Sequence, residues 1–137
     1  MLWQEDYSIG IQEIDDQHKE MVVHFDSIEK CIESGKEFYL LIQHVTELVQ
    51  YSKFHFKFEE ALMRLSGYPR SSLHKAQHEE FFTVLAEIGP NFTSTVNKSS
   101  VLKVASVSMI RHIIDDDRLY AEYLLSGVPI VKTTKIA

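Results

Sequence analysis

The sequence predicts an all-α protein, an up-down-up-down four-helix bundle with an extended N-terminal arm. Three observations predict this fold class. Apolar residues recur at three- and four-residue steps over four long segments, which is the spacing of one helix face. Glycines follow these segments, as they do where helices end. The connections between the segments are short, so consecutive helices are expected to lie antiparallel.

The arm is expected over residues 1–14, which contain one tryptophan, one tyrosine and three isoleucines. These residues are too apolar for a free arm, so we expect the arm to pack across the bundle. The helices are expected at residues 15–34, 37–66, 72–88 and 100–126. Their ends are marked by Gly35, Gly67, Gly89-Pro90 and Gly127.

Two further segments are expected to lie outside the helices. Residues 91–100 are rich in Thr, Ser and Asn, which is typical of a loop. Residues 128–137 follow the last helix as a tail or the start of a linker. At 137 residues the whole chain, 1–137, is expected to form one domain with a single core.

Composition and charge exclude several kinds of partner. The 14 Lys and Arg residues are scattered among 20 Asp and Glu, whereas nucleic-acid binding needs a clustered basic face. No apolar stretch approaches the roughly 18 residues of a membrane span, and the N-terminus lacks the order of a secretory signal. Because Cys31 is the single cysteine, no internal disulfide can form. We therefore expect a cytoplasmic protein without nucleic-acid or membrane partners.

The informative residues are polar side chains on the faces that should meet the core. An unpaired carboxylate or imidazole is costly to bury, so each needs a partner. One histidine on a core face is more often a hydrogen-bonded core residue than a ligand. Five histidines with carboxylates cannot satisfy one another cheaply, whereas a bound cation selects neutral imidazole and ionised carboxylate. The core-facing set is His18, His55, Glu59, His74, His78 and His112.

The spacing and chemistry of this set predict a metal site. His55 and Glu59, like His74 and His78, are four residues apart and therefore share a helix face. No thiolate is available, and the nitrogen and carboxylate groups exceed what one ion needs. Two ions sharing carboxylate bridges fit better, and di-iron and di-manganese centres are both known in bundle cores. The two other histidines, His24 and His44, are expected at the surface or paired elsewhere.

From Trp3 to about Leu125 the chain resembles the bacterial hemerythrins. The motifs that carry the resemblance are Gly10-Ile11, Ile14-Asp15-Asp16-Gln17-His18-Lys19, His55-Phe56-x-x-Glu59-Glu60, Gly67-Tyr68, His74-x-x-x-His78 and His112-Ile113-x-x-x-Asp117-x-x-Tyr120. Their order and spacing are highly specific. The resemblance implies a bundle holding two iron ions (Fe2+/Fe3+) with an oxo or hydroxo bridge, a non-heme centre that binds dioxygen reversibly.

The resemblance also implies the role of each side chain. His74, His78 and His112 would hold one iron, His18 and His55 the other, and Glu59 and Asp117 would bridge them. Counting the bridging oxygen, the first iron then has six ligands and the second has five. The open position, where dioxygen should bind, would lie on the His18 and His55 side. The matching pocket residues are Met21, Phe56, Met109, Ile113 and Tyr120.

Two positions need comment. The family usually has tryptophan four residues before the last histidine, where this chain has Ser108, and Met109 replaces a leucine. A smaller, more polar wall there would admit water. Ideal helix geometry pairs His112 with Asp116, whereas the resemblance implies Asp117, five residues on. We follow the resemblance and predict a local widening of the fourth helix.

The expected function is oxygen carriage, storage or delivery, without an enzymatic activity. The alternative is an oxygen- or redox-sensing module, whose partner would be a signalling protein; an oxygen carrier would instead serve an oxygen-consuming protein. A di-iron oxidase or nitric-oxide-handling enzyme is less favoured. Oxidase-type centres are dominated by carboxylates, whereas here five histidines accompany two carboxylates.

Overall fold

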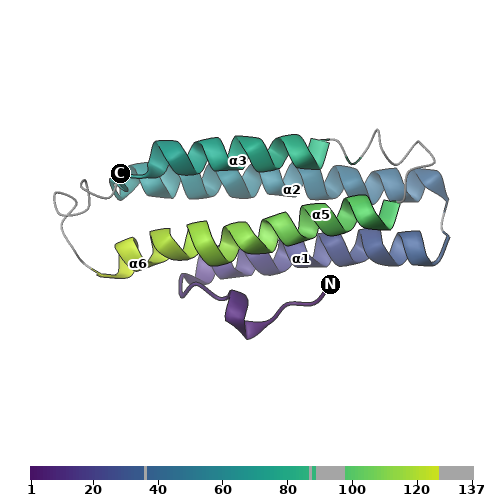
Figure 1. Ribbon diagram of the computed structural model, residues 1–137, viewed down its shortest axis with the longest axis horizontal. Coiled ribbons are helices and arrows are strands. Elements are labelled where there is room, and N and C mark those ends of the chain that lie inside the picture. Colours follow the sequence, from purple (N-terminus) through teal and green to yellow (C-terminus); the bar gives the residue numbers. More distant parts are fainter. Residues whose placement is uncertain (36, 87, 89–97, 127–137) are drawn as a thin grey trace.

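The computed structural model describes residues 1–35, 37–86, 88 and 98–126, and these form the predicted helical bundle (Figure 1). A short 3-10 turn, η1 (Glu5–Tyr7), precedes α1 (Gln12–Glu33), α2 (Phe38–Leu65) and α3 (Ser71–Ala86). The fourth rod is built in three parts, α5 (Lys98–Arg111), the π-helical turn η2 (His112–Asp117) and α6 (Arg118–Ser126). Successive rods run in alternating directions.

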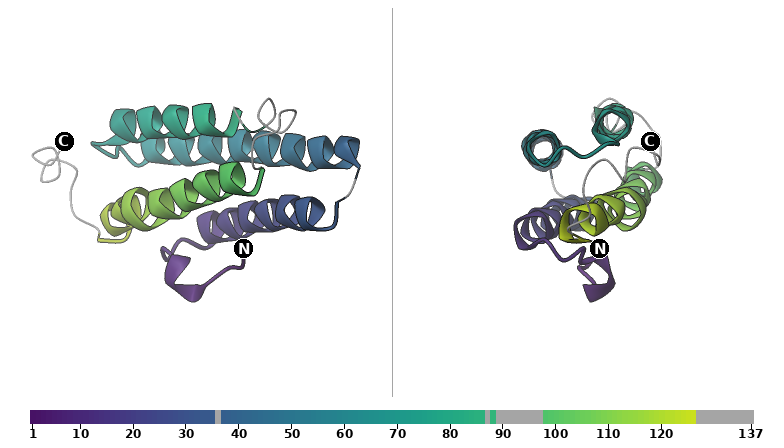
Figure 2. Two further views of the ribbon diagram at one scale, coloured as in Figure 1. Left: turned by 45° about the vertical axis from the view of Figure 1, so that its right-hand side comes forward. Right: turned by 90° about the vertical axis from the view of Figure 1, so that its left-hand side faces the viewer.

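Each rod has two neighbours, so the bundle closes around one core. The helix α1 packs on α2 and α5, and α3 packs on the same two helices from the other side. Figure 2 shows this arrangement end-on, with the N-terminal arm lying beneath α1 and the fourth rod. Within the described residues, no helix is long and apolar enough to cross a membrane.

The predicted boundaries were right to within a few residues. The first helix begins at Gln12 rather than residue 15, so the arm is shorter than predicted. The fourth begins at Lys98, so the last residues of the predicted loop are helical. The rest of that loop (91–97), the predicted ends at Gly89-Pro90 and Gly127, and the tail 128–137 lie outside the described residues.

The arm packs across the bundle as predicted, and polar contacts with α1 and α6 hold it there, including ion pairs from the Met1 ammonium group to Asp26 and Glu29. The Asp15 carboxylate accepts hydrogen bonds from the Ser8 hydroxyl (2.6 Å) and the Ile9 backbone N–H (2.8 Å). The Arg118 guanidinium donates to the Asp6 carbonyl, tying the arm to α6. Gly10 lies just before α1 and has φ +87°. A β-carbon there would lie 3.3 Å from a Leu125 methyl group of α6. The arm therefore depends on α1 and α6 for its conformation.

A glycine cap and three tyrosines fix one end of the bundle. Gly67 (φ +67°) ends α2 with hydrogen bonds from its own N–H to Arg64 and from the Tyr68 N–H to Met63, which is a Schellman motif. From α6, the Tyr123 hydroxyl donates to the Ser66 carbonyl (2.9 Å). The rings of Tyr68, Tyr120 and Tyr123 pack against one another. This clamp holds α6 against the end of α2.

The core is apolar along most of its length and polar in one layer. Leu48, Ile28 and Leu85, for example, are fully buried. Nine polar or charged residues are also buried, and all but two of them belong to the set predicted to bind metal. Those two are Asp15, which anchors the arm, and Ser52.

Candidate metal centre

The structure brings all seven predicted ligand side chains into one buried layer. They come from all four rods, and none is more than about a tenth exposed. The ligand side chains of α1 and α3 lie near the starts of these helices, and those of α2 and the fourth rod lie near the ends. Because successive rods run in opposite directions, these side chains come to the same level of the bundle. The seven are His18 (α1), His55 and Glu59 (α2), His74 and His78 (α3), and His112 and Asp117 (η2).

The π-helical turn η2 brings Asp117 to the cluster. In a regular α-helix, residues five apart point about 140° apart. In η2 the hydrogen bonds span five residues, as in the bond from the Arg118 N–H to the Ile113 carbonyl, and the turn is wider. His112 and Asp117 therefore share a face, and the predicted widening of the fourth helix is confirmed.

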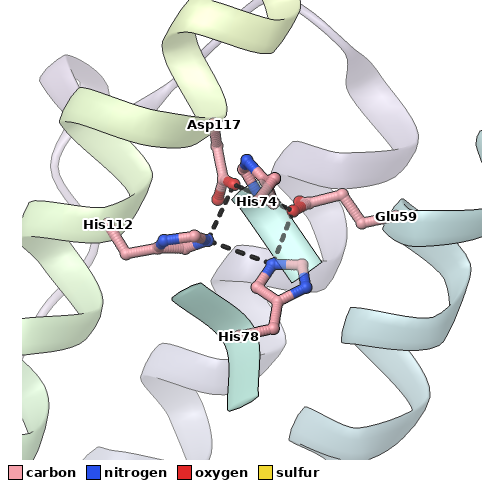
Figure 3. A group of neighbouring side chains, drawn as sticks. All are labelled: Glu59, His74, His78, His112 and Asp117. Atoms are coloured by element: carbon pink, nitrogen blue, oxygen red, sulfur yellow. Dashed lines mark hydrogen bonds and ion pairs between the residues drawn. The ribbon is translucent and has the colours of Figure 1, made fainter. Parts of the chain in front are cut away.

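On one side of the cluster, three histidines lie around two carboxylate oxygens, one from Glu59 and one from Asp117 (Figure 3). Glu59 Oε1 lies 2.7 Å from His74 Nε2 and 2.9 Å from His78 Nε2. Asp117 Oδ1 lies 2.9 Å from His74 Nε2 and 3.0 Å from His112 Nε2. We call His74, His78 and His112 with these two oxygens the three-histidine side.

The second oxygen of each carboxylate faces the other two histidines. Glu59 Oε2 lies 3.4 Å from His55 Nε2 and 3.8 Å from His18 Nε2. Asp117 Oδ2 lies 3.0 Å from His18 Nε2. We call His18 and His55 with these oxygens the two-histidine side. Both carboxylates thus divide their oxygens between two groups of imidazoles, which is the arrangement of a carboxylate shared by two cations.

Three acceptors outside the cluster fix the orientation of the rings. His55 Nδ1 donates to Gln17 Oε1 (2.7 Å), His78 Nδ1 to Glu60 Oε2 (2.8 Å) and His112 Nδ1 to Asp116 Oδ2 (3.0 Å). A proton on Nδ1 leaves the Nε2 lone pair of a neutral ring pointing into the cluster, as metal-ligating histidines require. We call these acceptors, Gln17, Glu60 and Asp116, the ring anchors.

In the neutral state, the lone pairs of two rings would meet without a proton between them. His78 Nε2 and His112 Nε2 are only 3.1 Å apart, although both rings donate through Nδ1. Two neutral rings in this arrangement would repel each other. In addition, Glu59 Oε2, both Asp117 oxygens and His18 Nε2 are buried without a hydrogen bond of good geometry, although they lie close to one another. Cations on both sides would satisfy these atoms, so the residues present fit a metal centre.

The electrostatics of the two sides differ. Burial opposes charge on His74, but its hydrogen bonds to Asp117 and Glu59 outweigh burial and raise its pKa to about 9. Burial opposes charge on His112 too, yet the Asp117 charge raises its pKa well above the usual value. At His55 burial dominates and lowers the pKa. Without metal, His74 and His112 therefore retain protons while His55 stays neutral, so a metal ion must displace the protons of His74 and His112 in order to bind them.

The pKa values of the two carboxylates are lowered. Burial would raise the pKa of Asp117, but the adjacent His112 charge and the close ring nitrogens of His112, His18 and His74 hold it well below the usual value. The pKa of Glu59 is also lowered, because hydrogen bonds and charges from His55 and His74 outweigh burial and the nearby Asp117. Both carboxylates are thus held in the ionised form that binds cations.

The predicted oxygen-pocket residues are all buried. The Phe56 ring stacks on His78 at 4.2 Å between centroids, and lies 5.7 Å from the His55 ring. It therefore contacts the three-histidine side more closely than the side where the open position was expected. The Tyr120 hydroxyl is engaged with the Ser66 hydroxyl at 2.9 Å. The remaining members, Met21, Met109 and Ile113, are each no more than about 2% exposed.

Ser108 lines an open cavity beside the cluster. Its side chain is half-buried, and the cavity of about 300 Å3 is also lined by His112 and Asp116. Solvent therefore reaches the outer face of His112, on the three-histidine side. The more polar wall predicted from Ser108 is present there, away from His18 and His55.

The residues assigned no ligand role lie outside the cluster. His24 is 3.7 Å from Glu20 and His44 is 3.8 Å from Glu47, each on its own helix. Cys31 is buried in the core.

The ring anchors were missed as a group by the sequence analysis, which considered only Asp116 and only as a ligand. A signal for them exists, because each is the sequence neighbour of a cluster residue. Gln17 precedes His18, Glu60 follows Glu59 and Asp116 precedes Asp117. A neighbouring residue points about 100° away from the ligand face, toward the next helix. Each anchor therefore holds a ring that another rod supplies, except Asp116, which holds His112 within η2.

Comparison with known proteins gives one consistent result. Residues 9–124 match the family described as "Hemerythrin HHE cation binding domain". The chain is 36% identical over 123 residues to the bacteriohemerythrin of Pseudomonas aeruginosa (strain LESB58), covering 89% of this chain and 80% of that protein. It is 34% identical over 126 residues to the bacteriohemerythrin of Stenotrophomonas maltophilia (strain R551-3), with the same coverage. The matched residues, 9–124, span every residue of the cluster.

Proposed function

The chain belongs to the hemerythrin family, and from this premise we propose that it binds dioxygen reversibly at two iron ions. The irons would be joined by Glu59, Asp117 and an oxo or hydroxo bridge. Their purpose would be oxygen carriage, storage or delivery. The cluster of buried His, Glu and Asp side chains in a hemerythrin-type bundle supports this proposal.

One observation carries the proposal, namely the unequal division of imidazoles around the shared carboxylates. The three-histidine side offers three nitrogens and two carboxylate oxygens, and the two-histidine side offers two nitrogens and two oxygens. With one bridging oxygen, an ion that takes six ligands would be fully coordinated on the first side and would lack one ligand on the second. The His18 and His55 side is therefore where we expect an exogenous ligand to bind.

The iron pair, when bound, would supply the two electrons that pass reversibly to dioxygen. The chain's own contribution is to hold the imidazoles and exclude bulk water. His18 and His55 are each about 1% exposed, so a ligand on their side is surrounded by protein. The apolar Met21 and Ile113 are equally buried and would favour a small uncharged ligand over an anion.

The same ligand set favours binding over oxidation of a substrate. Di-iron carboxylate centres of other bundles use a glutamate on each helix and only two histidines. Here neutral imidazoles outnumber carboxylates by five to two. With fewer anionic ligands, high-valent iron is stabilised less. We therefore propose a binding protein rather than an enzyme.

Oxygen or redox sensing is the alternative that a specific observation favours. His112 and Asp117 lie in η2, and η2 continues directly into α6. A change in ligation at these residues would move a helix that the tyrosine clamp otherwise holds. An oxygen-dependent change in the proteolysis or hydrogen exchange of α6 would favour sensing, and its absence would favour carriage.

Anaerobic iron loading followed by cycles of oxygenation tests the proposal. We expect two irons per chain and a visible absorption band that appears with oxygen and disappears when oxygen is removed. A band that converts once to a stable oxidised spectrum, with release of peroxide, would contradict reversible binding. Failure to retain iron in stoichiometric amounts would contradict the metal centre itself.

A further inference from the structure

A groove between α2 and α3 lies directly outside the three-histidine side of the cluster, with Phe56 and His78 in its lining. Its volume is about 380 Å3, and its exposed lining is almost entirely apolar. Phe56 and Phe82 supply the aromatic part of the lining. We call this feature the α2–α3 groove. Its size suits a small organic molecule rather than a single ion.

Three lysines surround the groove. Lys53 and Lys57 come from α2 and Lys75 from α3, and all three are exposed. None has a carboxylate partner within ion-pairing distance among the described residues, although the chain carries a net charge of −6. Their stems extend the apolar lining while their ammonium groups remain free at the rim. The groove therefore combines an aromatic lining with unpaired positive charge.

Two carboxylates also line the groove and limit this charge. The Glu60 carboxylate is turned inward and accepts the Nδ1 hydrogen bond of His78 at 2.8 Å. Glu79 is exposed on α3, four residues after Lys75. Three cations against two anions leave a local excess of one positive charge, on a protein whose overall charge is negative. An anionic ligand is therefore attracted to the groove although the protein as a whole is negative.

The groove is connected to the cluster through stacked rings. The Phe56 ring lies nearly parallel to the His78 ring, at an angle of 14° and 4.2 Å between centroids. His78 Nε2 in turn lies 2.9 Å from Glu59 Oε1. A planar ring in the groove would thus be separated from the three-histidine side by Phe56 and His78 alone.

We propose that the α2–α3 groove binds an anionic flavin, whose reduced form would return electrons to the oxidised metal pair. This inference rests on the proposed function, because it assumes that the centre is iron. The reduced ring would give up two electrons and two protons. The two electrons would account for the reduction of two ferric ions to two ferrous ions, and the protons would leave to solvent. The oxidised, planar ring would then dissociate.

The observations favour a small ligand over a docked protein. The lining is concave, aromatic and confined to two adjacent helices, and the lysines lie on both walls. A negatively charged group on a planar molecule would meet ammonium groups from both walls, whereas the ring would cover Phe56 and Phe82. A second electron-transfer protein would instead need a wider complementary face.

Binding is tested first, by fluorescence titration of the full chain with flavin mononucleotide. We expect saturable binding, with weaker binding of lumiflavin, which has the same ring without phosphate, and no competition by inorganic phosphate alone. In the double variant Lys53→Glu/Lys75→Glu, the dissociation constant should rise at least about tenfold. Lys103→Glu, the same change at an exposed lysine of a different cavity, should bind like the parent chain.

Electron delivery is tested next, by anaerobic reduction of the iron-loaded oxidised chain. The rate with reduced flavin mononucleotide should saturate at the concentration at which binding saturates, and should fall in Lys53→Glu/Lys75→Glu but not in Lys103→Glu. Iron content and oxygen spectra are recorded for all variants. Dithionite, a small inorganic reductant, should reduce every variant at a similar rate.

The outcomes separate the two proposals. Absence of saturable flavin binding, or equal binding by both lysine variants, would overturn the groove assignment and leave oxygen binding untouched. Flavin binding to a chain without reversible oxygen spectra would overturn the proposed function and keep the groove as a ligand site. Lysine-dependent binding without lysine-dependent reduction would overturn the electron-delivery step.

Discussion

The two sides of the cluster are built from the same residue types but are held differently. On the three-histidine side, His78 and His112 donate to the carboxylates of Glu60 and Asp116. On the two-histidine side, His55 donates to the neutral amide of Gln17, and His18 Nδ1 has no hydrogen-bond partner. Carboxylate anchors make an imidazole a stronger donor to metal, and a neutral anchor does so less.

This difference fits the different roles that we propose for the two sides, with an exogenous ligand binding only on the two-histidine side. The three-histidine side has negatively charged anchors, which would hold an ion there strongly. The two-histidine side has a neutral anchor, so an ion there would be held less strongly and would exchange a ligand more readily. The hydrogen bonds behind the rings, as well as the number of histidines, therefore distinguish the two sides.

The largest expected effect comes from removing a residue that serves both sides. Glu59→Ala should abolish iron binding on both sides, because each would lose an oxygen at once. The iron-dependent part of the free energy of unfolding, about 3 kcal/mol or more, should disappear with it. Metal analysis and thermal unfolding with and without chelator measure this. Glu13→Ala, at an exposed position of α1, is the control, and two irons retained in Glu59→Ala would contradict the bridging role.

A smaller effect should separate the sides. His18→Ala removes one of two imidazoles from the two-histidine side and leaves the other side intact. We expect about half of the iron to be lost together with the oxygen-dependent band. Iron content and visible spectra of the same sample measure both quantities. His24→Ala on the same helix should change neither, and loss of all iron from His18→Ala would show that the sides do not bind independently.

Exchanging the ring anchors should change how strongly each side stabilises an oxidised metal ion, without removing a ligand. Gln17→Glu puts a carboxylate behind His55, and Glu60→Gln removes one from behind His78. Second-layer changes alter metal affinity by about 10- to 100-fold. The reduction potential should therefore fall in Gln17→Glu and rise in Glu60→Gln, by about 60 mV for a tenfold preference. Spectroelectrochemical titration measures the shift, and shifts of the same sign would refute the comparison.

The smallest effect is expected at the cavity beside His112. Ser108→Leu should fill part of the space that Ser108, His112 and Asp116 line, and should raise the free energy of unfolding by about 1 kcal/mol. Oxygen affinity should change less than about twofold, because the free position is on the other side. Denaturant unfolding and oxygen titration test this. A large change in oxygen affinity would place the exchangeable ligand on the three-histidine side instead.

The fold and the cluster could be predicted because both depend on local periodicity. Polar residues such as His55 and Glu59 recur on the same helical face as the apolar core residues, so their convergence follows from the bundle. Asp117 could not be predicted from periodicity, since regular geometry favours Asp116, and only the resemblance to hemerythrins pointed to it. In the structure both aspartates contact His112. Asp117 lies beside its Nε2 atom in the cluster, and Asp116 accepts the hydrogen bond of its Nδ1 atom on the opposite side of the ring.

Other features depend on how neighbouring rods are shifted along one another, which a single sequence does not reveal. The ring anchors lie about 100° from the ligand face, so their role depends on the position of the adjacent helix. The same holds for Asp15, whose carboxylate caps the arm rather than joining the cluster. The α2–α3 groove likewise arises only when Lys53 and Lys75 are placed on facing walls.

The wide turn η2 makes the fourth rod intolerant of small changes in length. Deleting one residue from positions 113–116 would favour an ordinary helix and rotate everything after it by about 100°. Tyr123 would then leave the Ser66 carbonyl, and Leu125 would leave the space beside Gly10. A single deletion would thus break both the contact that holds α6 against the end of α2 and the contact of α6 with the N-terminal arm. Insertions and deletions among relatives should therefore avoid this stretch, even where its side chains vary.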